Sequence, residues 1–230
     1  MSRVVVVIGG SGGIGRAIAQ GFAASGDSVL ATGHAPVGAT PGIEDRLLDV
    51  RDDAAVSDFF GQLSQLDVLV NAAGVIRRGG EEFTPAGFAD VIDINLTGAL
   101  RTSAAARSLL AATRGAIINI ASMLSYFGSG VAPAYSASKG GIAQLTRSLA
   151  IAWAGDGIRV NALAPGWIAT ALTEALQDDP ARSAALMART PMNRWGRAED
   201  LVGPALFLAS PGAAFVTGAI LPVDGGYSAA

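Results

Sequence analysis

The stretch that decides the fold is Val4-Val5-Val6-Val7-Ile8-Gly9-Gly10-Ser11-Gly12-Gly13-Ile14-Gly15. Five consecutive β-branched residues that end in glycines predict a short buried strand. From Gly13 to about Ala24 the apolar residues recur at helical spacing, and Gly26 ends this pattern as a helix C-cap glycine would. A strand, a glycine turn and a helix therefore follow one another directly.

This context makes the turn a candidate phosphate cradle. Glycines let the backbone come close to a pyrophosphate, and a helix N-terminus offers free N–H groups and the positive end of its dipole. A glycine-rich turn without a ligand is the alternative, but the flanking strand and helix favour a dinucleotide site. The residues that would form it are Gly9, Ser11, Gly12, Gly13, Ile14 and Gly15.

The alternation continues along the chain. Strand-like apolar runs recur at residues 28–32, 67–70, 116–120, 159–163 and 220–223, and helical patterns at about 54–63, 84–94, 98–112, 134–154 and 199–209. Buried-type strands that alternate with helices predict an α/β fold with a parallel sheet covered on both faces. Pro222 places the last strand at a sheet edge. No linker divides the chain, so we expect one domain over residues 1–230, with a partly helical substrate-binding lid at about 166–196.

The composition excludes several classes of protein. Half of the 230 residues are apolar, which excludes disorder. The chain has no Cys and a single His, His34, which disfavours disulfides, zinc sites and a Ser-His-Asp hydrolase. The net charge is −3 without a basic stripe, and no apolar stretch reaches the length of a membrane span. We therefore expect a cytoplasmic protein that uses no metal and binds neither nucleic acid nor membrane.

A second group of polar residues could carry proton-transfer chemistry. Tyr135 and Lys139 are four residues apart, so on a helix they share a face, and a nearby ammonium lowers the pKa of a phenol. Lys139 is the only lysine of the chain, which argues against a chance surface pair. Ser122 directly follows an apolar strand, at the edge where open α/β sheets bind ligands. Asn95 lies in a mostly apolar stretch, where it could also simply tie a helix bend to a neighbour.

In their order and spacing these motifs resemble the short-chain dehydrogenase/reductase family over essentially the whole chain. The resemblance rests on Gly9-xxx-Gly13-Ile14-Gly15, Asn71-Ala72-Ala73-Gly74, Asn95, Ser122, Tyr135-xxx-Lys139, Pro165-Gly166 and Asp224-Gly225-Gly226. It implies a doubly wound Rossmann fold with a seven-stranded parallel sheet in the order 3-2-1-4-5-6-7. It also implies a hydride transfer between a nicotinamide and a secondary alcohol or ketone.

The resemblance assigns roles to four catalytic residues. Tyr135 would be the general acid/base at the substrate oxygen, and Lys139 would lower its pKa and hold the nicotinamide ribose. Ser122 would orient the substrate oxygen, and Asn95 would hold a water of a proton relay from Lys139 to solvent. A cofactor-binding regulator on the same fold is the competing class of function. The presence of all four residues argues against it.

The resemblance also assigns contacts to the cofactor. Beyond the glycine turn, Tyr135 and Lys139, these would be Gly33, His34, Asp49, Val50, Asn71, Ala72, Ala73, Gly74, Pro165, Gly166, Ile168 and Thr170. Two positions depart from the family pattern, since Ile8 stands where Thr is usual and Ala72 where a second Asn is usual.

The choice between NAD and NADP is less direct. The end of the second strand carries no acid that would bind a ribose 2′-hydroxyl, as NAD-dependent members usually have. Position 12, which is often basic in NADP-dependent members, is Gly12. His34 could contact a 2′-phosphate or be a solvated loop residue. We expect NAD rather than NADP.

The substrate is predicted from weaker signals. The runs around Arg77-Arg78, Ser122-Met123 and Arg194-Trp195 resemble those of 2-dehydro-3-deoxygluconate dehydrogenases, a sugar-acid branch of the family. An Arg fork suits a carboxylate, so Arg77 or Arg78 could bind the substrate, although both could equally be solvated. Met123, Trp167 and Trp195 could shape the pocket or belong to the core.

Two further expectations follow from the family. A 3-oxoacyl-thioester reductase would use the same four residues, but its acidic carrier protein would need a basic rim, which a net charge of −3 does not suggest. Members of the family are mostly tetramers, so we expect a homotetramer, or a homodimer.

Overall fold

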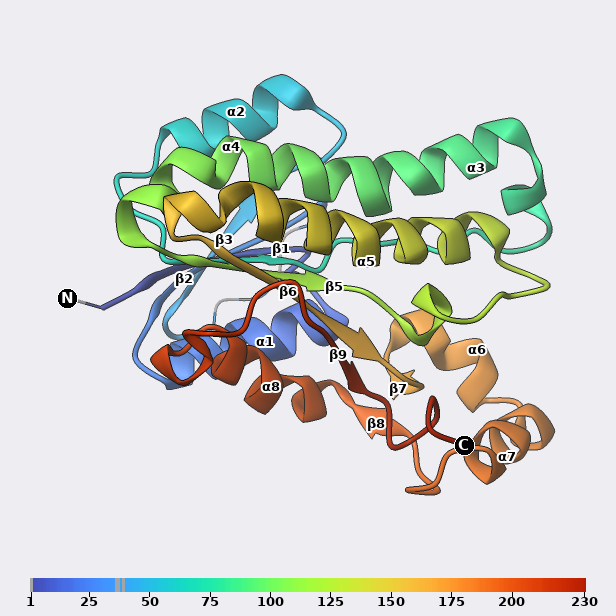
Figure 1. Cartoon of the computed structure of the whole chain (residues 1–230). Helices are drawn as coiled ribbons and strands as arrows, with labels where there is room; N and C mark the ends of the chain where they lie inside the picture. The colour runs from blue at the N-terminus through green and yellow to red at the C-terminus, as the bar shows by residue number, and fades with distance from the viewer. Residues whose placement is uncertain (1, 36–37, 39) are drawn as a thin grey trace.

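The computed structural model of the chain describes residues 2–35, 38 and 40–230. Its centre is a seven-stranded parallel sheet in the order β3-β2-β1-β4-β5-β6-β9 (Figure 1). This confirms the predicted doubly wound topology, because the chain turns outward in both directions from β1. Pro222 lies in the edge strand β9, as expected. The strands are β1 (Val4–Ile8), β2 (Ser28–Gly33), β3 (Ile43–Leu47), β4 (Val68–Asn71), β5 (Ala116–Ile120), β6 (Arg159–Pro165) and β9 (Ile220–Val223).

Helices cover both faces of the sheet, as Figure 1 shows. One face carries α2 (Asp53–Gly61), α3 (Pro85–Ile92), α4 (Gly98–Thr113) and α5 (Pro133–Trp153). The opposite face carries α1 (Gly13–Ala24) and α8 (Val202–Leu208). A sheet covered in this way is dry on both sides, which explains why its strands are apolar at consecutive positions rather than at alternating ones.

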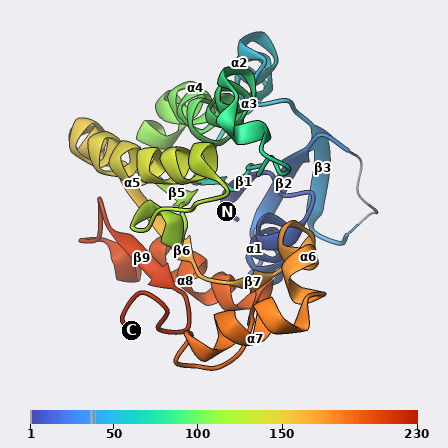
Figure 2. The ribbon, with the colours of Figure 1, turned by 90° about the vertical axis from the view of Figure 1, so that its right-hand side faces the viewer.

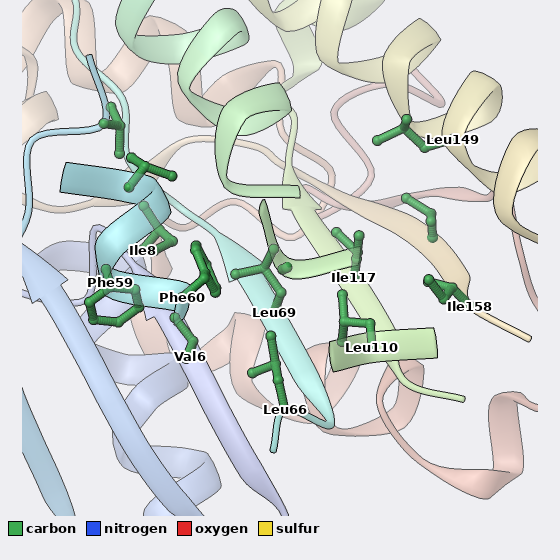
Figure 3. Packing of buried hydrophobic residues seen from close by; sticks show 14 of the residues in the cluster. Val6, Ile8, Phe59, Phe60, Leu66, Leu69, Leu110, Ile117, Leu149 and Ile158 are labelled. Atoms are coloured by element: carbon green, nitrogen blue, oxygen red, sulfur yellow. The ribbon is translucent and has the colours of Figure 1, made fainter. Parts of the chain in front are cut away.

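Strand β1 shows this arrangement residue by residue, because successive side chains of a strand point to opposite faces. Val6 and Ile8 belong to a core cluster that includes Phe59, Phe60, Leu110, Leu149 and Ile158 (Figure 3). Val5 and Val7 belong to the cluster on the other face, with Ile18 and Phe22 of α1. Val5, Val6 and Val7 are fully buried, so this first strand anchors both hydrophobic layers.

A nearly continuous helix from Pro85 to Thr113 contains one irregular turn. Thr84 caps its N-terminus, where the Thr84 hydroxyl accepts the Gly87 N–H at 3.0 Å, and Pro85 is the first helical residue. Residues Asp93–Thr97 form a π-turn between α3 and α4. A π-turn inside an α-helix is often found at a functional position, and this one contains Asn95.

The segment at 166–196, predicted to be partly helical, forms a separate small unit. Strands β7 (Ile168–Ala169) and β8 (Gly196–Arg197) pair with each other outside the main sheet. Helices α6 (Glu174–Gln177) and α7 (Pro180–Ala188) lie between them. Figure 2, which looks toward the carboxyl ends of the central strands, shows α6 and α7 beside these ends. None of the helices among the described residues is long and apolar enough to cross a membrane.

Candidate active site

The glycine turn between β1 and α1 is tightly packed. Gly9 has a φ of +79°, and a Cβ placed on it would lie 2.5 Å from the backbone nitrogen of Ala73. A Cβ on Gly15 would collide with the Gly9 carbonyl. Helix α1 begins after Gly12 without a side-chain cap and without an acid in its first turn. The first-turn N–H groups therefore have no side-chain partner and face no repelling charge, so the residues present fit a dinucleotide pyrophosphate.

The end of β2 packs against this turn. A Cβ on Gly33 would collide with the Ser11 side chain, so the two predicted cofactor residues are in direct contact. Thr32, one position earlier, is 1% exposed, and its hydroxyl has no hydrogen-bond partner within the described residues. His34, the residue after Gly33, is exposed. A buried hydroxyl without a partner next to a glycine is a place where a ligand could supply the missing bond.

Asp49 and Val50 follow β3 at the same edge of the sheet. The Asp49 carboxylate pairs with Arg51 at 2.7 Å. Hydrogen bonds from Arg51 lower the pKa of Asp49 to about 2, and the neighbouring His34 lowers it slightly further. Val50 is buried at 6% exposure and lies under the helix that begins at Gly98. A fixed negative charge therefore lies near His34, at the predicted adenosine end of the site.

The Asn71 side chain has a structural position. Its Nδ2 donates to Asn119 Oδ1 at 2.9 Å and to Ser103 Oγ at 3.0 Å, and its Oδ1 accepts from Thr102 Oγ1 at 2.8 Å. All four side chains are buried, so this network ties β4 to β5 and α4. Within the segment 71–74, the residues that contact the glycine turn are Ala72 and Ala73 rather than the Asn71 side chain.

The end of β6 forms the opposite wall. Pro165, Gly166, Ile168 and Thr170 all line one large cavity. The Thr170 side chain approaches the glycine turn, because a Cβ on Gly13 would lie 3.6 Å from Thr170 Cγ2. The predicted nicotinamide residues are thus brought next to the predicted pyrophosphate residues.

Ser122, Tyr135 and Lys139 meet where β5 ends. Ser122 caps a short turn by accepting the Leu124 N–H at 3.1 Å, and it lines the cavity together with Tyr135. The Lys139 Nζ donates to the Ile120 carbonyl at 2.6 Å and lies 5.5 Å from the centre of the Tyr135 ring. Lys139 is 4% exposed, and this burial lowers its pKa to about 8. The predicted proton-transfer residues are therefore neighbours in space.

The pKa of Tyr135 differs from the sequence-based expectation. Burial raises the pKa of Tyr135 to about 12, the hydrogen bond with Ser122 lowers it, and the Glu82 carboxylate raises it further. The ammonium of Lys139 is directed to the Ile120 carbonyl rather than to the phenol oxygen. In this arrangement burial is the largest influence on the pKa of Tyr135, so the expected lowering is corrected to a raised pKa.

Asn95 fastens the loop after β4. Its Oδ1 accepts the Val75 N–H at 2.8 Å, and its Nδ2 donates to the Val75 carbonyl at 3.0 Å and to Ser138 Oγ at 3.1 Å. A Cβ on Gly74 would lie 3.6 Å from Asn95 Oδ1 and 3.7 Å from Lys139 Nζ, so both groups border the same small space. The amide oxygen keeps one lone pair, with which it could bind a water near the lysine.

The cavity above these residues has a volume of about 1010 Å³ and a mostly apolar lining. Its charged residues are four arginines, Arg77, Arg78, Arg182 and Arg189, and no Asp or Glu lines it. The Arg77 side chain pairs with Asp90 at 2.6 Å, and Arg78 Nη2 donates to the Leu172 carbonyl at 2.6 Å. No described carboxylate pairs with Arg182 or Arg189.

The aromatic residues form one contact series. Trp167 lines the cavity and packs edge-on against both Trp195 and Tyr227. The Trp195 indole donates to Ser183 Oγ at 2.8 Å, so Trp195 supports the wall from behind. Met123 also lines the cavity and is 4% exposed.

Several cavity residues were not predicted from the sequence. Arg189 lies 4.4 Å above the ring of Tyr227, and both line the cavity. Arg182 lies on α7, and Arg189 is the residue at which that helix ends. The two are seven residues apart, which is two helical turns, so the sequence contained a signal that they lie on the same side. Glu82, which contacts Tyr135, gave no such signal. Among the described residues, no group of three His, Cys, Asp or Glu could hold a metal ion.

Comparisons with known proteins agree with this geometry. A family model described as Enoyl-(Acyl carrier protein) reductase matches residues 9–228. The 2-dehydro-3-deoxy-D-gluconate 5-dehydrogenase of Bacillus subtilis is 40% identical over 239 residues, which cover 98% of this chain and 94% of that protein.

Two solved structures have the same fold. The first is a Beutenbergia cavernae protein with bound NADP at low occupancy; it is 42% identical, with a TM-score of 0.91, and the match covers 99% of this chain and 97% of that one. The second is a gluconate 5-dehydrogenase from Burkholderia cenocepacia in complex with NADP and tartrate; it is 34% identical, with a TM-score of 0.92, and the match covers 100% and 97%. The chain belongs to the short-chain dehydrogenase/reductase family, whose members are NAD(P)-dependent oxidoreductases that act on CH–OH groups.

Proposed function

We propose that this protein oxidises a secondary alcohol of a sugar acid, or reduces the corresponding ketone. The observation that carries the proposal is the cavity: Ser122 and Tyr135 lie in its wall, and all of its charged residues are arginines. A guanidinium binds a carboxylate with two parallel hydrogen bonds, so this lining favours an anionic substrate. The Burkholderia relative was crystallised with tartrate, which is also a hydroxy acid.

The chemistry divides between the cofactor and four residues of this chain. A bound nicotinamide supplies or accepts the hydride. In the direction of reduction, Tyr135 Oη gives a proton to the substrate oxygen, and Ser122 Oγ holds that oxygen in place. Lys139 binds the nicotinamide ribose and returns a proton to the phenol, while Asn95 holds a water at the end of this path. The buried ammonium, beside the same ring, keeps a proton available near neutral pH.

The remaining contacts belong to the cofactor. Gly9, Ser11, Gly12, Gly13, Ile14 and Gly15 surround the pyrophosphate, and Gly33, His34, Asp49 and Val50 the adenosine. Asn71 braces Ala72, Ala73 and Gly74 along the cofactor, and Pro165, Gly166, Ile168 and Thr170 flank the nicotinamide. We prefer NAD over NADP, because the end of β2, Thr32-Gly33-His34, carries no Arg or Lys for a 2′-phosphate.

Residues 166–196 act in this proposal as a substrate-binding lid on a single domain. The lid supplies Trp167, Arg182 and Arg189 to the cavity, and the bond from Arg78 to the Leu172 carbonyl joins it to the loop after β4. We also expect a cytoplasmic homotetramer. Ile151 on α5 and Phe215 after α8 are 81% and 104% exposed, which supports burial of these faces against other copies. Light scattering behind a sizing column measures the assembly.

The test follows the absorbance of the reduced nicotinamide with the purified protein. NADH and NADPH are each offered with keto sugar acids, the matching neutral polyols, and an acetoacetyl thioester. We expect turnover of a keto sugar acid with NADH. In Tyr135→Phe, kcat should fall by about 10² to 10⁴ while cofactor binding persists, because only the proton donor is lost. Tyr126→Phe is the matched control, since Tyr126 lies outside the cavity lining.

Each alternative result has a defined meaning. Turnover of the thioester alone would replace the sugar-acid proposal with the acyl-thioester reductase. Cofactor binding that persists without turnover of any alcohol or ketone would instead favour a regulator. Full activity of Tyr135→Phe would remove Tyr135 from the mechanism.

A further inference from the structure

Glu82 is a buried charge with no assigned role. It is 1% exposed, and among the described residues Glu82 and Lys139 are the only acidic or basic residues that are buried. Burying a carboxylate costs free energy unless hydrogen bonds compensate for the lost water. A buried acid next to a reaction site therefore needs a structural or chemical reason.

The two oxygens of Glu82 join two walls of the site. Its Oε1 accepts the backbone N–H of Arg77 at 2.9 Å, in the loop after β4. Its Oε2 accepts the backbone N–H of Tyr135 at 2.9 Å, in the first turn of α5. Both partners are donors, so the carboxylate in its ionised form satisfies both bonds.

Helix α5 needs this carboxylate because its own sequence provides no cap. Its N-cap residue is Ala132, which makes no side-chain bond to the first turn, and Pro133 occupies the first helical position. Glu82 supplies the missing acceptor from a distant part of the chain. A negative charge there also faces the positive end of the helix dipole.

The local chain geometry brings Glu82 to this position. Gly79 and Gly80 have φ values of +68° and +86°, which side chains rarely adopt, and the short turn Glu81–Phe83 follows at once. The preceding loop is fastened independently, since the Asn95 amide holds Val75. The loop is therefore held at two points, one by Asn95 and one by Glu82.

We propose that Glu82 is a positioning residue for the proton transfer. Its carboxylate fixes the first turn of α5, and with it Tyr135, against the loop that carries Arg77 and Arg78. It also places a negative charge at the backbone of Tyr135, in the first turn of α5. This inference rests on the role of Tyr135 given under the proposed function.

The charges around Tyr135 determine the expected pH dependence. Lys139 faces the ring from the same helix, and Glu82, in the turn before α3, accepts the backbone N–H of Tyr135. The guanidinium of Arg77, in the loop after β4, is paired with the Asp90 carboxylate. Because the charge of Glu82 raises the pKa of Tyr135, its removal should lower that pKa. The pH limb of kcat that depends on the phenol should then move to lower pH.

The experiment compares Glu82→Gln with Glu81→Gln, a change at the exposed neighbouring residue. The amide of Gln can accept only one of the two bonds and carries no charge. We expect kcat of Glu82→Gln to fall by about a hundredfold with a shifted pH limb, because small displacements of a catalytic group have effects of this size. KM should change little, and Glu81→Gln should match the original protein. An unshifted pH limb with an unchanged kcat would overturn the proposal.

A second variant and a second measurement cover other outcomes. Glu82→Asp keeps the charge but shortens the side chain, so it should lose kcat without shifting the pH limb, and original kcat values would contradict the proposal. Hydrogen exchange of the peptide that starts at Pro133 measures the cap without any substrate. Faster exchange in Glu82→Gln without activity on sugar acids would uphold the cap and refute the proposed substrate. Unchanged exchange in an active enzyme would refute the role of Glu82.

Discussion

At the scale of single residues, the Lys139 ammonium shows how burial controls charge. Its Nζ donates a hydrogen bond to the Ile120 carbonyl at 2.6 Å, and burial lowers its pKa from 10.5 to about 8. In the unfolded chain the lysine returns to its ordinary pKa. Between these two values the unfolded chain binds more protons than the folded one, so the free energy of unfolding should rise with pH.

The corresponding prediction concerns stability rather than activity. The cost of burying the charged ammonium is fully present below about pH 8 and is relieved as the pH rises toward 10.5. The slope can reach about 1.4 kcal/mol per pH unit for one group. Lys139→Met cannot titrate and should lose this slope. Urea unfolding of both proteins across this range measures it, and parallel curves would show that Lys139 does not titrate there.

At the scale of elements, the β1–α1 turn separates two kinds of glycine. A Cβ on Gly9 would meet the Ala73 backbone at 2.5 Å at a positive φ, whereas a Cβ on Gly12 would meet nothing within 4 Å. Gly9→Ala should therefore lower the melting temperature and weaken cofactor binding by at least about tenfold, because the turn must move. Gly12→Ala should have the same melting temperature as the original protein. Calorimetry and cofactor fluorescence test the pair, and equal behaviour of the two variants would contradict the packing argument.

Helix α7 gives a prediction about specificity. Arg182 lines the cavity from α7 and Arg189 from the end of that helix, and no described carboxylate pairs with them. Arg189→Gln should raise KM for a keto sugar acid by about tenfold to a hundredfold, which is the loss expected for one charged hydrogen bond, and leave kcat nearly unchanged. A neutral polyol should show no such change. Arg147→Gln, at an exposed position of α5, is the control, and an equal effect on acid and polyol would exclude carboxylate binding.

Elements differ in how well the sequence predicts them. Six of the seven central strands were predictable from apolar runs such as Val4–Ile8, whereas β3 (Ile43–Leu47) is mostly charged and shows no such run. The strand order was predicted from the family resemblance. The site residues at strand ends follow from that order. The π-turn at Asp93–Thr97 and the bond between Glu82 and Tyr135 were not predictable, because they depend on tertiary contacts that leave no local pattern. The predicted lowering of the pKa of Tyr135 was wrong for the same reason. The spacing of Tyr135 and Lys139 in the sequence does not show that the phenol is buried, and burial raises its pKa.

At the scale of the whole molecule, the proposed cofactor site uses segments from most of the sheet. The ends of β1, β2, β4 and β6 each contribute, so a bound dinucleotide would connect elements that are far apart in sequence. A ligand that binds only the folded state stabilises all of it, by about 2.7 kcal/mol at a hundred times its Kd. For a domain of this size that corresponds to a rise in Tm of about 5 to 10 °C.

Thermal unfolding with NADH and with NADPH therefore tests both the site and the choice of cofactor. At equal concentrations NADH should give the larger rise in Tm, because the end of β2 carries no Arg or Lys for a 2′-phosphate and the nearby Arg51 is paired with Asp49. Gly9→Ala should show a smaller rise in Tm with either cofactor, since its turn fits the pyrophosphate less well. Asp49→Asn should narrow the difference between the two cofactors by favouring NADPH. A larger rise with NADPH in the original protein would reverse the cofactor preference, and no rise with either would refute the dinucleotide site itself.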